Sequence, residues 1–276
     1  MTTEMKAPAA CGTRPLLAGA GGGAFSGLTG VGGGAVLVPL LTGQLKLSQH
    51  RAHATSLAII LFIASAGAIG YWHAGNIDWR LVATLAPGAV IGVYAGAKMM
   101  VHVPAPQLRL LFGLFLFFVA FRQLFWDVSA GTPHDGGVAV AIELGFGVAG
   151  GALAGILGVG GGAVFVPAIV IFGLAHVGAA GDPQKVAQGV SLVVIACTGF
   201  VGTLTNLRQQ AIDLETVKWV LPSAVAAAFI ASLWANRLDA EILKRVYGVV
   251  ALLLGTQIIV NTVRMMHARS APAQRV

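Results

Sequence analysis

Two glycine-rich segments contain the residues of this sequence best suited to hold a ligand. Gly30-Val31-Gly32-Gly33-Gly34-Ala35-Val36 recurs as Gly158-Val159-Gly160-Gly161-Gly162-Ala163-Val164, a constant offset of 158 − 30 = 128 positions. Consecutive glycines in an apolar run favour a break in a helix. A break exposes backbone N–H groups at the start of the next helix, where the helix dipole favours an anion. The repeated motif therefore predicts an anion site that backbone amides help to build.

The same glycines have a second interpretation, in which they only let two helices cross closely. Upstream ladders suit that role well: Gly19, Gly23 and Gly27 recur as Gly147, Gly151 and Gly155. Three consecutive glycines are more than a crossing needs. The ladders are therefore interpreted as packing surfaces, and segments 30–34 and 158–162 as a site.

Polar side chains near the two motifs could add hydrogen bonds, although helical serine and threonine often bond their own backbone. The candidate substrate-binding residues are Thr29, Gly30, Gly32, Gly33, Gly34, Thr55, Ser56, Gly158, Gly160, Gly161, Gly162, Gln188 and Ser191. Four more residues could attract an anion at the mouth of the site: Arg51, His53, Asn206 and Arg208.

Other chemistries find little support. The spacing Gly30-x-Gly32-x-x-Ala35 fits a dinucleotide-binding pattern, but no acidic residue lies about 20 positions further on. The two cysteines, Cys11 and Cys197, give neither a disulfide framework nor a metal site. Glu143 aligns with Pro15 and is expected at a membrane interface, so no buried carboxylate relay for protons is predicted. We expect no catalytic residue, no metal and no cofactor.

Composition places these motifs in a membrane. The chain is 57% hydrophobic and only 10% charged, whereas soluble domains are near one quarter charged. Several apolar runs of about 20 residues predict an all-α polytopic membrane protein. The net charge of +7 is spread over tails and loops, so nucleic acid is not an expected partner. The expected partners are a small anion and the lipid bilayer, and a homo-oligomer is left open.

Apolar runs and turn signals predict eight spans in a tandem four-plus-four repeat. The spans are expected at 16–41, 54–72, 80–99, 108–126, 138–172, 187–206, 216–234 and 243–263. The expected organisation is an N-terminal tail (1–15), repeat 1 (16–126), a linker (127–137), repeat 2 (138–263) and a C-terminal tail (264–276). The first span is interpreted as an uncleaved helix rather than a signal peptide. In each repeat the first span is long and broken by the glycine motif.

Beyond the motifs the two halves align at an offset of 135, since Ile77-Asp78 matches Ile212-Asp213 and Pro87 matches Pro222. Four crossings per half would give both halves the same orientation. If the first span of each half is re-entrant, three crossings remain and the halves are inverted, and both arrangements occur in transporters. With eight spans, Lys and Arg divide eight against eight between the two sides. Sidedness is therefore not predicted.

Local signals give further expectations. Tyr71 and Trp72 are expected as anchors at the membrane interface, and Asp78 as the N-cap of the next helix. The ladder Gly88, Gly92 and Gly96 predicts a close helix contact. Lipid is expected to face five phenylalanines of the fourth span: Phe112, Phe115, Phe117, Phe118 and Phe121.

The duplicated pattern from Gly23 to Pro39, with Ala54-Thr55-Ser56-Leu57 after its first copy, resembles the TauE/SafE family of sulfite and organosulfur-anion exporters. This resemblance covers nearly the whole chain. It implies a carrier of small, often sulfur-containing anions in the bacterial-type plasma (inner) membrane. The second copy has Ala154 in place of Ser26 and Val190 in place of Thr55, so the two halves cannot supply identical ligands.

The expected function is therefore a secondary transporter, in the direction of export, of sulfite, a sulfonate or a related anion. Two alternatives stay open: an anion channel, and a membrane subunit of a larger complex. An enzyme is not expected, because the sequence has no recognisable catalytic constellation.

Overall fold

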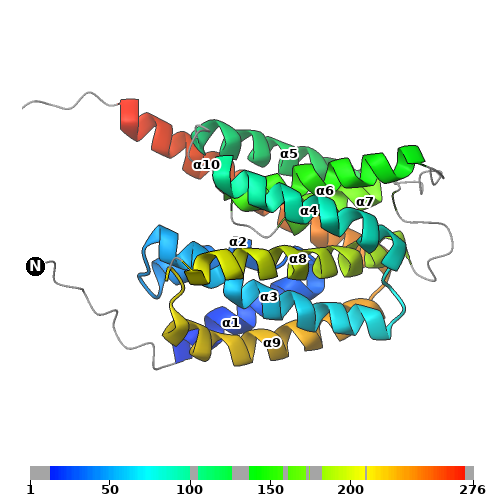
Figure 1. Cartoon of the computed structure of the whole chain (residues 1–276), viewed down its shortest axis with the longest axis horizontal. Helices are drawn as coiled ribbons and strands as arrows, with labels where there is room; N and C mark the ends of the chain where they lie inside the picture. Colours follow the sequence, from blue (N-terminus) through cyan, green and yellow to red (C-terminus); the bar gives the residue numbers. More distant parts are fainter. Residues whose placement is uncertain are drawn as a thin grey trace, which may run out of the picture.

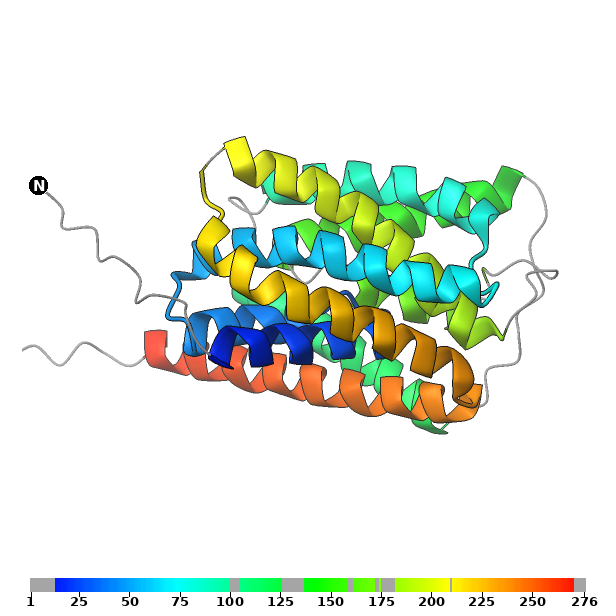
Figure 2. The ribbon, with the colours of Figure 1, turned by 90° about the horizontal axis from the view of Figure 1, so that it is seen from below.

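The computed structural model describes residues 13–99, 105–125, 137–157, 161–171, 174, 182–208 and 210–270. The regular structure of these residues is ten helices with no strand, as an all-α membrane protein requires. In chain order they are α1 (Thr13–Thr29), α2 (Gly34–Gly43), α3 (Gln49–His73), α4 (Trp79–Met99), α5 (Ala105–Phe125), α6 (Gly137–Leu157), α7 (Gly162–Ile171), α8 (Pro183–Arg208), α9 (Leu214–Arg237) and α10 (Ala240–Ser270). The long helices run side by side along the longest axis of the molecule (Figure 1 and Figure 2).

Each copy of the glycine motif joins two helices that form an antiparallel hairpin. A Cβ atom built on Gly22 of α1 would lie 2.7 Å from the side chain of Leu37 in α2. In one straight helix these residues would be about 22 Å apart, so α2 folds back along α1. The same contact recurs between α6 and α7, where a Cβ on Gly150 would meet the ring of Phe165. Neither segment 16–41 nor segment 138–172 is a single broken span.

Two tight helix pairs join the first half of the chain to the second, and both run parallel. Helix α1 packs on α9 and α4 packs on α6, and at either contact a Cβ atom on the ladder glycines would collide with the partner's backbone. On α1 these glycines are Gly19, Gly23 and Gly27, which lie against Val220, Ala224 and Ala228. On α4 they are Gly88, Gly92 and Gly96, which lie against Leu144, Val148 and Ala152. The predicted packing role of the ladders is confirmed.

Two further pairs run antiparallel. In α3 and α8, Gly67 lies against Leu192 and Gly202 lies against Leu57. In α5 and α10, Gly113 lies against Ile259 and Gly248 against Leu124. Helices at equivalent positions in the two halves, such as α3 and α8, therefore point in opposite directions.

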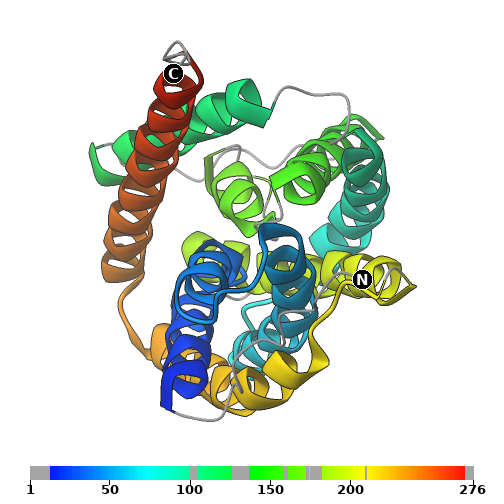
Figure 3. The same cartoon turned by 90° about the vertical axis from the view of Figure 1, so that its left-hand side faces the viewer.

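These directions divide the helix ends between two faces of the bundle. We call one of them the terminal face, because the start of α1 and the end of α10 lie there. It also holds the starts of α3, α5 and α9 and the ends of α2, α4 and α8. This is the left-hand end of Figure 1 and the end facing the viewer in Figure 3. The opposite face holds the starts of α4, α6, α8 and α10 and the ends of α3, α5, α7 and α9, while the turns between α1 and α2 and between α6 and α7 lie in the interior. Each hairpin returns to the face from which it started, α1–α2 to the terminal face and α6–α7 to the opposite face.

The prediction of eight spans is not confirmed. Among the described residues, six helices are long and apolar enough to cross a membrane: α3, α4, α6, α8, α9 and α10. Helix α1 has 17 residues and is about 25 Å long, less than a hydrocarbon core of about 30 Å. Shorter apolar helices cover Gly34–Gly43, Leu110–Phe125 and Gly162–Ile171. The predicted linker lies, apart from Gly137, outside the described residues.

Local predictions had mixed outcomes. Asp78 accepts hydrogen bonds from the N–H groups of Arg80 and Leu81, at 3.0 and 3.1 Å, as an N-cap should. Trp72 is 59% exposed, as expected of an anchor, whereas Tyr71 is fully buried, so its predicted place at the interface is wrong. Phe117, Phe118 and Phe121 are exposed as predicted. The prediction is wrong for Phe112, which is buried, and Phe115 is partly buried against the core.

Candidate anion site

Break 1, residues 30–33 between α1 and α2, has a backbone that only glycine adopts easily. Gly30, Gly32 and Gly33 have φ values of 71°, 88° and 71°, in the left-handed region that side chains disfavour. Helix α2 then begins, and the carbonyl oxygen of Gly33 accepts bonds from Val36 and Leu37. Ahead of these two residues, the N–H groups of Gly32, Gly33, Gly34 and Ala35 have no backbone acceptor among the described residues. Such unpaired amides at a helix start favour an anion.

The two glycine motifs meet inside the bundle. A Cβ atom on Gly162, the first residue of α7, would lie 2.6 Å from the carbonyl oxygen of Gly30 and 2.7 Å from Cα of Val31. Helix α7 is buried from Gly162 to Val170, and residues 30–34 are buried as well. The contact places Gly162 of the second motif against Gly30 and Val31 of the first motif in the interior.

Helix α8 contributes two of the predicted side chains to break 1. Ser191 donates a hydrogen bond of 2.8 Å to the carbonyl oxygen of Gly30. Gln188 lies directly against Gly30, where an added Cβ would be 2.8 Å from the Cα atom of Gln188. Its Oε1 accepts a bond of 2.6 Å from the hydroxyl of Tyr71, a residue of α3. Both side chains are fully buried.

Three fully buried side chains have a polar atom without a partner: Oγ of Ser26, Oγ of Ser56 and Nε2 of Gln188. All three atoms can donate a hydrogen bond. Ser26 lies at break 1, because its Cβ would be 3.5 Å from a Cβ atom on Gly33. Buried donors without acceptors are costly, so these atoms suit a ligand that supplies acceptors.

Two acceptors of break 1 are already used. The carbonyl oxygen of Gly30 is bonded to Ser191, and Oε1 of Gln188 to Tyr71. The carbonyl oxygen of Gly27 lies 3.2 Å from the same Tyr71 hydroxyl. Among its side chains, break 1 is therefore an uncharged environment with an excess of hydrogen-bond donors.

Break 2 is the segment 158–161 between α6 and α7, of which the structure describes Gly161. Gly161 has a φ of 77°, and its carbonyl oxygen accepts bonds from Val164 and Phe165. The residue beside it is Ala154, at 3.1 Å from an added Cβ, where break 1 has Ser26. Gly158 and Gly160, both predicted site residues, lie outside the described residues.

Two of the predicted threonines bond the protein itself. Thr29 donates to the carbonyl oxygen of Phe25 at 2.7 Å, within its own helix. Oγ1 of Thr55 accepts the N–H of Asp213 at 3.0 Å and so joins α3 to the turn before α9. The bond to Asp213 gives Thr55 a structural role, and its predicted place in the site stays a prediction.

The four residues predicted to attract an anion all lie at the terminal face, on the first turns of α3 and the last turn of α8. Arg51 and Arg208 are exposed, and His53 and Asn206 are half-buried. The side-chain amide of Asn206 donates to the carbonyl oxygen of Gly202 in its own helix. None of the described contacts brings these four to break 1.

Three residues of interest were not predicted as part of a site. Ser26 lies four residues before Gly30, and Gly30 N–H bonds its carbonyl oxygen at 2.9 Å. That spacing was an available signal. Tyr71 gave no signal beyond its position at a helix end. Glu143 is 3% exposed and hydrogen-bonded to Thr84 of α4, so its predicted place at a membrane interface is replaced by a buried contact between α6 and α4.

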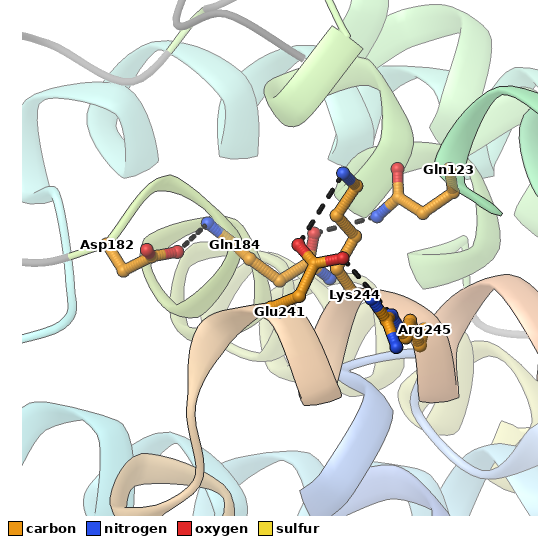
Figure 4. Close-up of polar contacts among 6 residues, drawn as sticks. All are labelled: Gln123, Asp182, Gln184, Glu241, Lys244 and Arg245. Atoms are coloured by element: carbon orange, nitrogen blue, oxygen red, sulfur yellow. Dashed lines mark hydrogen bonds and ion pairs between the residues drawn. The ribbon is translucent and has the colours of Figure 1, made fainter. Parts of the chain in front are cut away.

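A second buried polar cluster lies at the opposite face, where α5 ends and α8 and α10 begin (Figure 4). Gln123 donates to Gln184 at 2.8 Å, and Asp182 accepts the N–H of Gln184 at 2.9 Å. The two glutamines leave one acceptor, Oε1 of Gln123, and one donor, Nε2 of Gln184. The cluster is thus balanced, unlike break 1, and it serves to join α5 to α8.

Beside it, Glu241 pairs with Lys244 and Arg245 at 3.7 and 3.2 Å within the first turns of α10. Within the described ranges, no group of three His, Cys, Asp or Glu side chains is placed to hold a metal ion.

Comparison with known proteins decides the family. The chain matches the family described as "Sulfite exporter TauE/SafE" over residues 3–123 and 143–275. This protein belongs to the TauE/SafE family. A "Probable membrane transporter protein" of Xylella fastidiosa (strain 9a5c) is 26% identical over 251 residues, which cover 87% of this chain and 93% of the relative. No solved structure matches the chain.

Two Bacillus subtilis (strain 168) relatives agree with this placement. "Probable membrane transporter protein YunE" is 22% identical, covering 86% of this chain and 93% of its own length. "Probable membrane transporter protein YdhB" is 24% identical, covering 80% and 89%. This TauE/SafE member is thus a multi-pass membrane transporter, and the names of these relatives specify no substrate.

Proposed function

We propose that this TauE/SafE protein is a secondary transporter that exports a small oxyanion, with sulfite and organic sulfonates as the first substrates to test. The observation that carries the proposal is the donor excess at break 1. Oγ of Ser26 and Nε2 of Gln188 are buried without acceptors, and the amides of residues 32–35, at the start of α2, have no backbone acceptor among the described residues. An oxyanion supplies several acceptors at once.

The site has no opposing cationic side chain among the described residues, and an anion can be held without one. Hydrogen bonds to a charged ligand are about twice as strong as those between neutral groups, and the low dielectric of a buried site strengthens them further. Uncharged donors also let the ligand leave, which a transporter needs as much as binding. The four predicted residues at the terminal face would then raise the local anion concentration rather than hold the substrate.

The proposed transport mechanism rests on the opposite orientation of the two halves. Each half has one helical hairpin followed by three longer helices, and the two hairpins enter from opposite faces and meet at Gly30 and Gly162. A site between two inverted repeats can open to either side by the movement of one half against the other. In this arrangement the crossing helices are α3, α4 and α5 in one half, and α8, α9 and α10 in the other. Helix α5 crosses although its apolar part, Leu110–Phe125, is short, and α6, which is long enough to cross, forms a hairpin with α7 instead.

Flux into proteoliposomes loaded with a candidate anion tests the function. Counterflow of labelled sulfite or methanesulfonate, driven by an outward gradient of the unlabelled anion, is expected of a carrier. An anion channel would give flux without counterflow. Absence of anion-dependent flux, over a panel of sulfur oxyanions and carboxylates, would refute the proposal. A protein that copurifies and is required for flux would instead favour a membrane subunit of a complex.

Charge supports a cytoplasmic terminal face in the plasma (inner) membrane. Of the described Lys and Arg residues, nine lie at that face: Arg14, Lys46, Arg51, Lys98, Arg109, Arg208, Lys218, Arg264 and Arg269. Six lie at the opposite face: Arg80, Arg122, Lys185, Arg237, Lys244 and Arg245. Because positive residues favour the cytoplasm, we expect phosphatase and fluorescent-protein fusions after residue 270 to report a cytoplasmic end. An active phosphatase at that position would reverse the orientation.

A further inference from the structure

Tyr71 determines which end of the Gln188 amide is available at break 1. Its hydroxyl oxygen lies 2.6 Å from Oε1 of Gln188 and 3.2 Å from the carbonyl oxygen of Gly27. A tyrosine hydroxyl has one hydrogen to donate, and 2.6 Å is the length of a short O–H···O bond. The hydrogen therefore goes to Gln188, whose Oε1 is held by it. The amide is fixed in the orientation that leaves Nε2, the donor, without a partner.

We infer that Tyr71 is a positioning residue which makes break 1 select oxyanions whose oxygens carry no hydrogen. The inference rests on the proposed function and adds a basis for specificity to it. A bound O–H group needs an acceptor, and at the Gln188 amide the one acceptor, Oε1, is bonded to Tyr71. A ligand that carries an O–H group would place its hydrogen against the donor atoms of Ser26 or Gln188, which is unfavourable.

The residues that give this selectivity occur at break 1 and have no counterparts at break 2. At an offset of 135 positions, Tyr71 corresponds to Asn206 (71 + 135) and Gln188 corresponds to His53 (188 − 135). Asn206 bonds the carbonyl oxygen of Gly202 in its own helix, and Ala154 replaces Ser26. The tyrosine–glutamine pair and the unpaired serine hydroxyl thus occur together at break 1.

Two ligands of the same shape and charge isolate the effect. Methanesulfonate has three oxygens and no hydrogen on them, whereas the methylphosphonate monoanion has one O–H. We expect the purified protein to bind methanesulfonate at least about tenfold more tightly than the methylphosphonate monoanion, as measured by titration calorimetry. A buried donor that faces another donor instead of an acceptor weakens binding by about that factor. Methylphosphonate affinity should rise as pH increases and the ligand loses its second proton, while methanesulfonate affinity stays flat.

The Tyr71→Phe variant should reduce the preference for methanesulfonate to near unity, because the Gln188 amide can then turn and present Oε1 to an O–H group. Its pH dependence towards methylphosphonate should flatten as well. Tyr247→Phe is the matched control, since Tyr247 is another fully buried tyrosine, whose hydroxyl lies 3.4 Å from the carbonyl oxygen of Ala163. That variant should keep the preference of the unmodified protein.

The outcomes separate the two proposals. If the unmodified protein binds neither ligand nor any other oxyanion, the proposed function fails and the role of Tyr71 fails with it. If methanesulfonate binds but Tyr71→Phe keeps the same preference, the anion site stands and the role of Tyr71 is refuted. Should Tyr71→Phe not fold, the unmodified protein still decides: methylphosphonate affinity that is independent of pH refutes the inference.

Discussion

At break 1 the backbone turns through three glycines of positive φ beside Ser26, while at break 2 Gly161 turns beside Ala154. The two breaks thus share a backbone feature and differ in the side chain that faces it. The difference extends to the neighbouring helices, because the residues that correspond to Tyr71 and Gln188 are Asn206 and His53. A duplicated fold keeps its hairpins because both halves need them, whereas hydrogen-bond donors are needed only where the ligand is held.

The comparison also separates two uses of glycine. In the ladders of α1 and α4, glycine permits helices to touch backbone to backbone. At Gly33 and Gly161 it permits a left-handed conformation that other residues adopt at a cost of about 1–3 kcal/mol. Close helix packing is needed in both halves, so substitutions of ladder glycines should have similar effects in each half. Substitutions at break 1 and break 2 should have different effects.

The largest effect is expected from Gly33→Val, which should abolish transport. A valine there combines an unfavourable φ with a Cβ atom 2.7 Å from the carbonyl oxygen of Gly22, and backbone cannot move aside easily. Gly161→Val has a similar φ but meets the ring of Phe165 at 2.7 Å, and a side chain can rotate. We therefore expect residual flux in Gly161→Val, measured in proteoliposomes at matched protein content.

Gly21→Val is the control for this pair, because a Cβ atom on Gly21 has no neighbour within 4 Å. It should transport normally. Equal loss of flux in all three variants would mean that α1 tolerates no change, and break 1 would lose its special status.

The next largest effect is on stability and should be equal in the two halves. Gly23→Ala places a methyl group against the backbone of Ala224, and Gly151→Ala places one against Ala89. Forcing atoms into a packed contact costs about 1–3 kcal/mol, so both variants should melt at lower temperature in detergent than Gly21→Ala. A loss confined to one of them would show that the α1–α9 and α4–α6 contacts are not equivalent.

Much of this packing could be predicted from residue spacing, whereas the hairpins were only one of two alternatives that the sequence allowed. Glycines four positions apart, such as Gly19, Gly23 and Gly27, lie on one face of a helix and allow close packing, and this holds for any partner helix. The direction of the chain after Gly33 depends instead on whether Leu37 packs on Gly22, a contact with no local signal. The eight-span alternative, in which the first span of each half crosses, placed Lys46 and Arg51 on the side away from Arg14, whereas the hairpin brings them to the same face.

The donors of the site were only partly predictable for a related reason. Gln188 and Ser191 were identified because they follow the second motif in an aligned helix. Tyr71 was expected at the membrane interface, since aromatic residues at helix ends often lie there. Its hydroxyl finds its partner 117 positions away, in the other half of the chain. Pairings across halves depend on the hairpin topology, which the sequence pattern left open.

A smaller effect is expected when the serine is moved between the breaks. Ser26→Ala should weaken methanesulfonate binding about tenfold, as the loss of one hydrogen bond to a charged ligand does. Ala154→Ser alone should leave the affinity unchanged, because break 2 lacks the counterparts of Tyr71 and Gln188. Titration calorimetry measures both. If Ala154→Ser improves binding, both breaks contact the ligand and the asymmetry drawn between them is wrong.

The smallest effect concerns Thr55, whose counterpart is Val190. Its Oγ1 accepts the N–H of Asp213, so Thr55→Val removes a hydrogen bond between α3 and the turn before α9. Hydrogen bonds between membrane helices are worth about 0.6 kcal/mol on average, so a melting temperature only slightly lower is expected, with methanesulfonate affinity unchanged. Ser56→Ala is the informative neighbour, because Oγ of Ser56 has no partner and its loss should not lower stability. If Thr55→Val weakens binding and leaves stability intact, Thr55 belongs to the site after all, and the ligand extends from break 1 towards the terminal half of α3.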